Sequence, residues 1–507
     1  MGAGAIGGGE WLLGPLVTAK YGAGLLWLAT LSILFQGIYN VEISRYTLYC
    51  GEPIFSGKLR TLPGPGFWVF VYLLLDFGSV FPYLAANAAT PVAILWRGGS
   101  LPDPAHVAAD WWLVKIISSL ILVIATIPLL VGGKIYDSIR AVMTFKLVVV
   151  IGFLSVVAVF YSHFSSWREI LTGFVEFGNV PVQLSKAQVA SGEANVQNVF
   201  LSWFHTGRLP EIEWQLVAEI MALAAIAGNG GLSNAPISNY TRDQGWGMGH
   251  AVGAIPSMVA GHSLELSHVG KVFEVTPDSL VYWRGWVRHV VRDQWAVWVP
   301  ACFIGVALPS MLSVEFMPRG TTADKWNVAA LTAVNVGKHT AAPAADVLAS
   351  TSGLAQFASG PTWGNCFWGM TLFCGFIVLA TGMLTGVDGL IRRWVDVFWT
   401  ASPAMRQLDS SRIRHVYFCV LMGYLVFGMV MLWVNEPIKL INFATLGFNF
   451  ALGVSCWHTL AVNHRLLPRP LRPGWKSSLG LIIGGVFFTL LGAISSYKIL
   501  SDLGLVS

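Results

Sequence analysis

The sequence predicts an all-α, polytopic membrane protein. Of its 507 residues, 55% are hydrophobic and only 11% are charged, and the mean hydropathy is +0.63. Soluble domains carry about 25% charged residues, so this composition indicates a chain that lies in the membrane. The net charge of +5 is too small to suggest a nucleic-acid partner. The six cysteines show no CxxC spacing, so neither a zinc site nor a disulfide framework is predicted.

Eleven segments have the length and apolar character of a membrane-spanning helix, which needs about 20 residues. No cleavable signal peptide is visible, because the first apolar segment carries Glu10 and continues past it. We expect the spans at about 1–20, 22–45, 66–94, 111–131, 141–162, 213–235, 293–314, 364–386, 413–434, 438–461 and 477–497.

The distribution of basic residues predicts the orientation of these spans. With the N-terminus in the cytoplasm, most of the 31 lysines and arginines fall toward the inner side, among them Lys146, Arg392 and Arg393. The exceptions lie mainly in two long outer loops, 163–212 and 315–363, where this rule has little force. We therefore predict eleven spans with a cytoplasmic N-terminus, in a bacterial inner (plasma) membrane.

One inner segment, 240–292, mixes tryptophans with Arg284, Arg288 and Arg292. Aromatic and basic residues together suit a helix that lies at the level of the lipid headgroups. An ordinary cytoplasmic loop explains the same composition equally well. Both interpretations stay open.

The first spanning segment contains a glycine run that ends in a carboxylate, Gly7-Gly8-Gly9-Glu10. Each glycine costs about 1 kcal/mol of helix stability relative to alanine, and a glutamate at the bilayer centre costs a few kcal/mol more. We expect a helix break here, with a close helix-packing surface as the alternative. Only six residues precede the run, so we expect the native chain to start upstream of Met1.

A second glycine run, Gly228-Asn229-Gly230-Gly231, interrupts the sixth segment. Two glycine-interrupted spans at corresponding places in two halves of a chain point to the substrate site of a secondary transporter. Asn229 and Asn234 offer amide oxygens at or just after this break. The sequence therefore predicts a transporter whose site lies between the two breaks.

Several motifs together resemble the Nramp family of metal-ion transporters, which has a LeuT-type fold. Gly7 to Glu10 stands where that family carries Asp-Pro-Gly-Asn. The resemblance covers roughly 1–162 and 213–497. The further similar stretches are the second helix from Leu25 to Glu52, the link from Gly132 to Arg140 that leads into Lys146, and the end of the tenth helix from Asn463 to Pro473.

The resemblance implies a LeuT-type 5+5 inverted repeat with an eleventh helix. The first repeat is expected at 1–162, and the outer loop 163–212 follows it. The second repeat is expected at 213–462 with long loops at 236–292 and 315–363, and residues 463–507 add the last helix. The chain departs from the family in two places. Gly7 replaces the metal-binding aspartate, and the sixth helix has Ala227-Gly228-Asn229 in place of Met-Pro-His.

The expected binding residues lie at the two breaks. Glu10 and Asn229 are the candidate metal ligands, since hard cations take oxygen ligands, and capping of a half-helix is the alternative role of Glu10. No soft thioether ligand is found at the second break, so manganese or iron is supported only weakly. The full candidate set is Gly7, Gly8, Gly9, Glu10, Ala227, Gly228 and Asn229.

Other polar residues within spans are candidates for supporting roles. Asp76 and Glu219 are candidates for a proton pathway, because an acid inside a membrane helix faces a cavity or a partner. Glu42 and Arg45 are three residues apart, which favours a structural ion pair. Asp388 is expected to end the eighth helix, and the glycine after it gives a sufficient structural reason.

The sequence thus predicts a secondary transporter and not an enzyme. The resemblance implies a divalent metal ion as substrate (manganese, iron or magnesium), with protons as the coupling ion and no cofactor. A cation- or proton-coupled symporter of a small organic solute, such as an amino acid, is the alternative, because glycine-rich breaks expose N–H groups that suit an anion.

Overall fold

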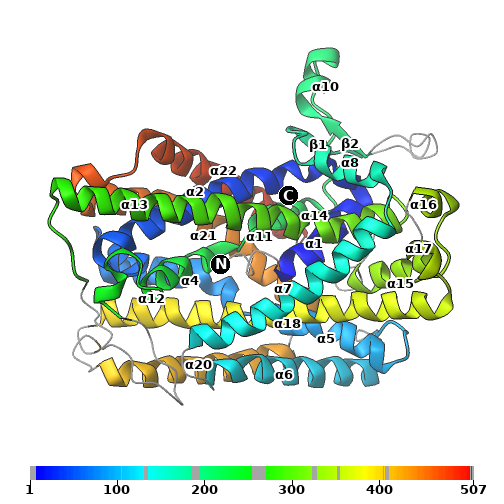
Figure 1. The fold of residues 1–507 in the computed structure, drawn as a ribbon, viewed down its shortest axis with the longest axis horizontal. Coiled ribbons are helices and arrows are strands. Elements are labelled where there is room, and N and C mark those ends of the chain that lie inside the picture. Colours follow the sequence, from blue (N-terminus) through cyan, green and yellow to red (C-terminus); the bar gives the residue numbers. More distant parts are fainter. Residues whose placement is uncertain are drawn as a thin grey trace.

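The structure is a computed structural model. It describes residues 7–502 and 504, apart from 104–105, 131–134, 184–194, 254–269, 322–327, 351–353, 403–404, 406–409 and 435–436. The described chain is almost entirely helical, which confirms the predicted all-α class (Figure 1). Two three-residue strands, β1 (Asn179–Pro181) and β2 (Val196–Asn198), form a small antiparallel hairpin.

The long helices, in chain order, are α1 (Gly8–Tyr21), α2 (Trp27–Cys50), α4 (Pro65–Asp76), α5 (Tyr83–Trp96), α6 (Ala108–Leu130), α7 (Ile135–Phe160), α11 (Val217–Ile226), α13 (Pro277–Asp293), α14 (Val299–Phe316), α15 (Val328–Ala341), α18 (Pro361–Ala401), α20 (Ser410–Val434), α21 (Pro437–Leu466) and α22 (Trp475–Asp502). The shorter helices are α3 (Ile54–Leu59), α8 (Phe164–Gly173), α10 (Val199–Thr206), α12 (Pro236–Asp243), α16 (Ala345–Ser350) and α17 (Leu354–Phe357). Single turns are η2 (Gly22–Leu25), η3 (Phe77–Val80), η4 (Gly231–Asn234), η5 (Gly247–Ala251), the π turn η6 (Gln294–Trp298) and η7 (Arg469–Leu471).

Each segment expected to span the membrane contains helix in its described residues. Within the described chain, seven helices are long and apolar enough to cross a membrane, and an eighth span results if α1 and α2, which meet at 94°, count as one. The segments expected at 213–235 and 438–461 hold α11 with η4 and α21, respectively, and these helices do not pass this test. The membrane character of the chain is therefore evident, and the count of eleven spans stays a prediction.

The third expected span contains a break that the sequence analysis missed. Helix α4 stops at Asp76, the turn η3 follows, and α5 starts only at Tyr83. Pro82 cannot donate a helical hydrogen bond, which explains the restart. Gly78 packs so closely on the backbone of Ala444 that any larger side chain would overlap it. The span expected at 66–94 is present as Pro65–Trp96, and it contains this interruption.

Two further boundaries differ from expectation. Asp388 does not end a helix, because α18, which is 41 residues long in total, continues past it to Ala401. The charged residues in this part of α18 are paired inside the bundle: Arg392 pairs with Asp388 on the same helix and with Asp243 of α12, and Arg393 pairs with Asp76 of α4. Helix α13 passes through η6 into α14, so the aromatic and basic residues of 277–293 extend a long helix (Figure 1).

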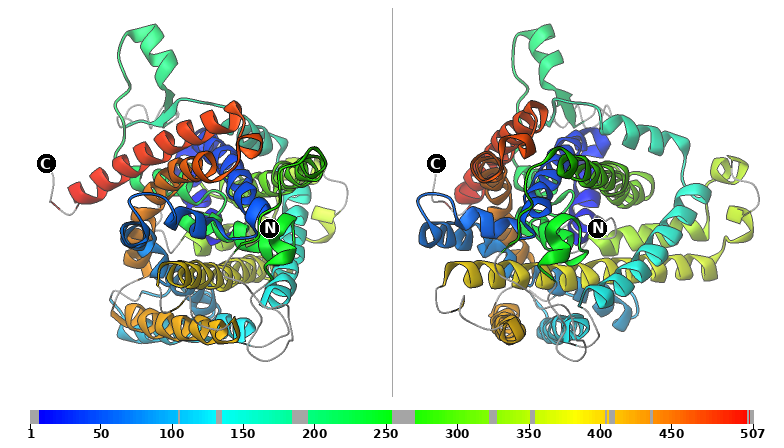
Figure 2. Two further views of the ribbon diagram at one scale, coloured as in Figure 1. Left: turned by 90° about the vertical axis from the view of Figure 1, so that its left-hand side faces the viewer. Right: turned by 60° about the vertical axis from the view of Figure 1, so that its left-hand side comes forward.

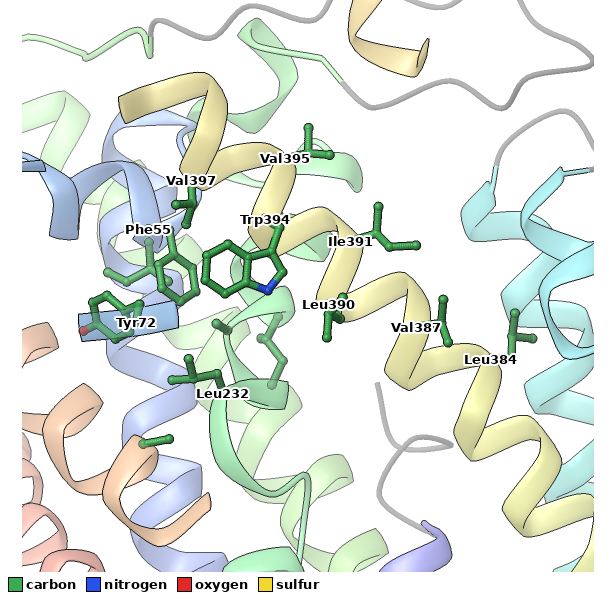
Figure 3. Packing of buried hydrophobic residues seen from close by; sticks show 14 of the residues in the cluster. Phe55, Tyr72, Leu232, Leu384, Val387, Leu390, Ile391, Trp394, Val395 and Val397 are labelled. Carbon is green, nitrogen blue, oxygen red and sulfur yellow. The ribbon is translucent and has the colours of Figure 1, made fainter. Parts of the chain in front are cut away.

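The helices pack as one bundle in which α18 lies along α5, α6 and α15 (Figures 1 and 2). Trp394 of α18 points toward Phe55 of α3 and Tyr72 of α4, and Leu232 of η4 lies nearby (Figure 3). Helix α1 begins in the middle of the molecule rather than at its edge (Figure 1). The glycine run at its start is therefore surrounded by other helices.

Candidate functional site

A cavity of about 350 Å³ lies where the three breaks meet. Its walls come from the start of α1, the η3 break, the break between α11 and α12, and the facing sides of α7, η6 and α18. Tyr424 and Phe448 close it from α20 and α21. Pockets that bind small ligands have volumes from about 300 Å³ upward, so this cavity is large enough for a hydrated ion or a small solute.

Glu10 lies in this cavity and joins the two predicted breaks. Its Oε2 accepts a hydrogen bond from the Gly7 backbone N–H (3.1 Å), and its Oε1 accepts one from the Gly228 N–H (3.0 Å). The side chain is buried, with 1% of its surface exposed. A carboxylate in the first turn of a helix is favoured by the helix dipole. Glu10 thus caps α1, as one interpretation of the sequence expected, and also contacts the opposite break.

The first glycine run both ends and packs a helix. Helix α1 begins at Gly8, with Gly7 in an extended conformation ahead of it. Gly8 and Gly9 lie inside the helix, where a Cβ on Gly8 would collide with Leu379 and one on Gly9 would overlap Ile226. The close packing expected as the alternative is present at Gly8 and Gly9. The predicted break stays a prediction, since residues 1–6 lie outside the described part of the chain.

The second break follows directly from its glycines. Helix α11 ends at Ile226, and Gly228, Gly230 and Gly231 have φ values of +112°, +61° and +55°. L-residues with side chains rarely adopt such angles, whereas glycine adopts them without a steric penalty. The helical turn resumes with η4 and continues into α12. The N–H of Gly228 is thereby released from the helix and points at Glu10.

The candidate residues divide into those that line the cavity and those that do not. Asn229 lines it, whereas the Ala227 carbonyl lies behind the break and accepts a hydrogen bond from Gln36 Nε2 (2.8 Å). Asn234 is buried and donates to Gln36 Oε1 (2.7 Å), outside the cavity lining. The cavity lining therefore includes Gly7, Gly8, Gly9, Glu10, Gly228 and Asn229, without Ala227.

The two candidate proton-pathway acids are buried but lie outside the cavity lining. Asp76 forms an ion pair with Arg393 (Oδ1 to Nη2, 2.9 Å) and accepts a hydrogen bond from Trp394 Nε1 (3.0 Å). Arg393 itself lines the cavity and also donates to the Leu232 carbonyl (3.2 Å), so Asp76 is coupled to the site through one side chain. Glu219 lies in the first turn of α11.

The sequence analysis missed several residues that line the cavity. Lys146, expected at an inner loop, is a buried residue of α7 that lines the cavity and attracts Glu10 electrostatically. Met143 of α7 and Met383 of α18 bring two thioethers to the lining, although the second break itself carries none, as the sequence indicates. A lysine or methionine inside an apolar segment is the only signal that could have identified them, and that signal does not tell which face of the helix it occupies.

Two lining groups have unsatisfied polar atoms. Among the described residues, neither Ser79 Oγ nor Trp298 Nε1 has a hydrogen-bond partner, and both residues line the cavity. Buried polar atoms nearly always have partners, so these two atoms are consistent with a polar occupant. The described part of the chain contains no cluster of three or more His, Cys, Asp or Glu side chains arranged to hold a metal.

Broken helices that meet at a central polar cavity, inside an all-α polytopic bundle, are the architecture of LeuT-type transporters. Solved structures agree with this class. A mutant of the manganese transporter of Eremococcus coleocola matches with a TM-score of 0.57 and 12% sequence identity, over 99% of this chain and 86% of that one. The same transporter in complex with an aromatic bis-isothiourea compound matches with a TM-score of 0.58, the same identity and the same coverage.

A third similar structure is Mhp1, a nucleobase-cation-symport-1 family transporter with bromovinylhydantoin bound. It matches with a TM-score of 0.40 and 13% identity, which is too low to carry an argument. No protein-family model matches this sequence, and no curated protein matches it significantly. The property that this chain shares with the manganese transporter is therefore its fold.

Proposed function

We propose that this protein is a secondary active transporter that carries a divalent metal ion in exchange with or together with protons. One observation carries the proposal: a buried carboxylate, Glu10, joins two helix breaks in a central cavity. Buried ionisable groups in membrane proteins are costly and mark ion or substrate pathways. The fold shared with a manganese transporter supports the same class of cargo.

The donor atoms around the cavity suit a partly hydrated cation. Glu10 and Asn229 supply a carboxylate and an amide oxygen, which are ligands for magnesium or manganese. Met143 and Met383 add thioether sulfurs, which favour softer ions such as iron. The cavity is much larger than a bare ion, so a bound ion would keep part of its water shell. Manganese, iron and magnesium are the proposed cargoes.

Proton coupling would use the same carboxylate. Protonation of Glu10 removes the negative charge that attracts a cation, so proton and metal compete for one site. Lys146 adds a positive charge nearby that a divalent ion must offset. Asp76 reaches the site through Arg393 and stays a candidate for proton passage, together with Glu219. The proposed location is a bacterial plasma membrane with a cytoplasmic N-terminus.

A small organic solute is the second candidate cargo, and the cavity lining favours it. Six aromatic side chains line the cavity. Three basic side chains, Arg140, Lys146 and Arg393, also line it, and Glu10 is the one acid among the described lining residues. A ring-bearing zwitterion could place its ammonium group at Glu10, its carboxylate at the basic groups and its apolar part on the rings. The aromatic residues are Phe81, Tyr83, Tyr240, Trp298, Tyr424 and Phe448.

Uptake into proteoliposomes tests the proposal. Purified full-length protein should accumulate Mn²⁺ faster under an inward-directed proton gradient than without one. Glu10→Gln should lower the initial rate by about tenfold or more, the effect of losing a charge-assisted contact worth 1.5–3 kcal/mol. Glu176→Gln, an exposed acid outside the cavity lining, is the matched control and should keep the wild-type rate.

Two outcomes would overturn the metal assignment. One is the absence of Mn²⁺, Fe²⁺ and Mg²⁺ flux by folded wild-type protein, and the other is flux that Glu10→Gln leaves unchanged. A thermal-shift screen of amino acids on the same protein then tests the second cargo. Stabilisation by an amino acid but by no metal would establish the organic solute instead.

A further inference from the structure

Gln36 of α2 makes four hydrogen bonds to groups around the second helix break. Its Nε2 donates to the Ala227 carbonyl (2.8 Å) and to Ser32 Oγ (2.9 Å). Its Oε1 accepts from the Asn229 backbone N–H (3.2 Å) and from Asn234 Nδ2 (2.7 Å). The side chain has no exposed surface, and every donor hydrogen and acceptor site of its amide is used.

The orientation of this amide is determined by its backbone partners. The Ala227 carbonyl can only accept a hydrogen bond, and the Asn229 N–H can only donate one. Gln36 therefore holds the chain on both sides of Gly228, in a segment that has left the regular helix. To make both backbone contacts, a residue at position 36 must carry a hydrogen-bond donor and an acceptor at the end of a side chain as long as that of glutamine.

The glycine between these two contacts is also enclosed. A Cβ on Gly228 would lie 2.9 Å from Gln36 Oε1 and 3.0 Å from the Trp298 ring. The Gly228 N–H points the other way, into the cavity, where it donates to Glu10 Oε1. The contacts made by Gln36 thus determine the direction of the N–H that faces the candidate ion ligand.

We infer that Gln36 is a positioning residue of the substrate site: it fixes the backbone on both sides of Gly228, so that the Gly228 N–H meets Glu10 and Asn229 lines the cavity. Gln36 does not line the cavity itself. The transport part of this inference rests on the proposed function. The positioning part concerns the chain alone and is tested without any substrate.

Hydrogen–deuterium exchange of the full-length protein in lipid nanodiscs tests the positioning. In Gln36→Leu, peptides covering 226–234 should exchange about tenfold faster than in wild type, the change expected when one backbone hydrogen bond is lost. Asn40→Leu is the matched control, because Asn40 is a buried amide one turn further along α2 and bonds Gln294 away from the break. It should leave exchange at 226–234 unchanged.

A second variant keeps the test decisive if Gln36→Leu does not fold. Gln36→Glu has the same shape and, when protonated, keeps an acceptor and one donor. Its exchange at 226–234 should lie between those of wild type and Gln36→Leu. Wild-type exchange at 226–234 in every folded Gln36 variant would overturn the inference, as would equal acceleration in Asn40→Leu.

Mn²⁺ uptake adds a readout that general destabilisation would not produce. Gln36→Leu should raise KM about tenfold and leave the maximal rate within about threefold, because it disturbs the site and not the transport cycle. Asn40→Leu should leave KM unchanged at a similar melting temperature. If wild type carries no Mn²⁺, the metal proposal fails while the exchange data still decide the role of Gln36. An unchanged KM in Gln36→Leu, with Mn²⁺ transport present, contradicts the inferred role.

Discussion

Individual glycines at the first break serve two different purposes. Gly7 is extended and leaves its N–H free to bond Glu10, whereas Gly9 brings α1 against α11 at Ile226. A helix-packing glycine leaves no room for a side chain, and a helix-start glycine does not need such close contact. Substitution by alanine therefore separates the two roles.

Gly9→Ala should lower stability although alanine is the better helix former. The gain in helix propensity is about 1 kcal/mol, while overpacking a filled contact costs typically 1–3 kcal/mol, and the added methyl group would overlap Ile226. Gly152→Ala on α7 is the matched control, since no atom lies within 4 Å of its added Cβ. Thermal unfolding in detergent should show a lower midpoint for Gly9→Ala only. If both variants unfolded at a midpoint equal to or higher than that of wild type, the close contact between α1 and α11 would be contradicted.

At the scale of helices, α18 is connected to its neighbours by buried ion pairs. Arg393 pairs with Asp76 of α4, and Arg392 pairs with Asp388 (2.8 Å) and with Asp243 of α12 (2.6 Å). These side chains are almost fully buried. Removing one partner of a buried pair is costly because the other charge remains without compensation.

Arg393→Leu should therefore destabilise the protein by about 3–5 kcal/mol, because it leaves the Asp76 carboxylate buried without its ion pair. The double variant Asp76→Leu with Arg393→Leu should be less destabilised than Arg393→Leu alone. It should not reach wild type, since Trp394 Nε1 and the Leu232 carbonyl lose partners. Denaturant unfolding of the three variants measures this. A double variant at least as unstable as Arg393→Leu would show that the pair is not the source of the loss.

His163, the residue directly before α8, connects the start of that helix with α14 and α16. His163 Nδ1 lies 2.7 Å from Glu315 at the end of α14, and its Nε2 lies 2.6 Å from Asp346 of α16. The hydrogen bond to the Glu315 carboxylate raises the pKa of His163 above its usual 6.5, with Asp346 adding to the effect. The hydrogen bond from His163 in turn lowers the pKa of Asp346. Protonated imidazole is thus the form that connects these elements.

The stability that comes from this contact should depend on pH. A raised histidine pKa stabilises the folded protein fully below pH 6.5, and the contribution is lost as pH rises through the raised pKa. The difference in melting temperature between wild type and His163→Gln should therefore be largest near pH 6 and shrink toward pH 9. His205→Gln, an exposed histidine of α10, should show no such pH dependence. If the difference in melting temperature between wild type and His163→Gln did not change with pH, the charged contact would be ruled out.

For the molecule as a whole, two kinds of feature could be predicted from the sequence: the fold class, which follows from composition, and the sites of the glycine runs. The apolar segments predicted the all-α membrane class. The run at Gly228–Gly231 coincides with a break between helices, and the run at Gly7–Glu10 coincides with the start of α1. Glycine and a membrane acid are informative because their cost is intrinsic to the residue. Glu42 and Arg45 likewise form the predicted ion pair, at 2.8 Å. The inverted repeat and the eleven-span count remain predictions.

The features that could not be predicted from the sequence depend on which helices pack against each other in the folded protein. The break at η3 needs only Pro82 and the tight packing of Gly78 on α21, and neither forms a run. Lys146 was assigned to the inner surface by a rule about loops, although it lies buried beside the cavity. Gln36 is a single amide in an apolar helix. Its role depends on contacts with residues about 190 positions away.

The central claim is that the substrate binds between the two helix breaks at Glu10. Crystals of the full-length protein soaked in Mn²⁺, with diffraction recorded at the manganese absorption edge, test it most directly. We expect one anomalous peak inside the cavity, within coordination distance of a Glu10 oxygen, and no such peak in crystals of Glu10→Gln. A well-ordered cavity without an anomalous peak at saturating Mn²⁺, or a peak elsewhere in the molecule alone, would contradict it.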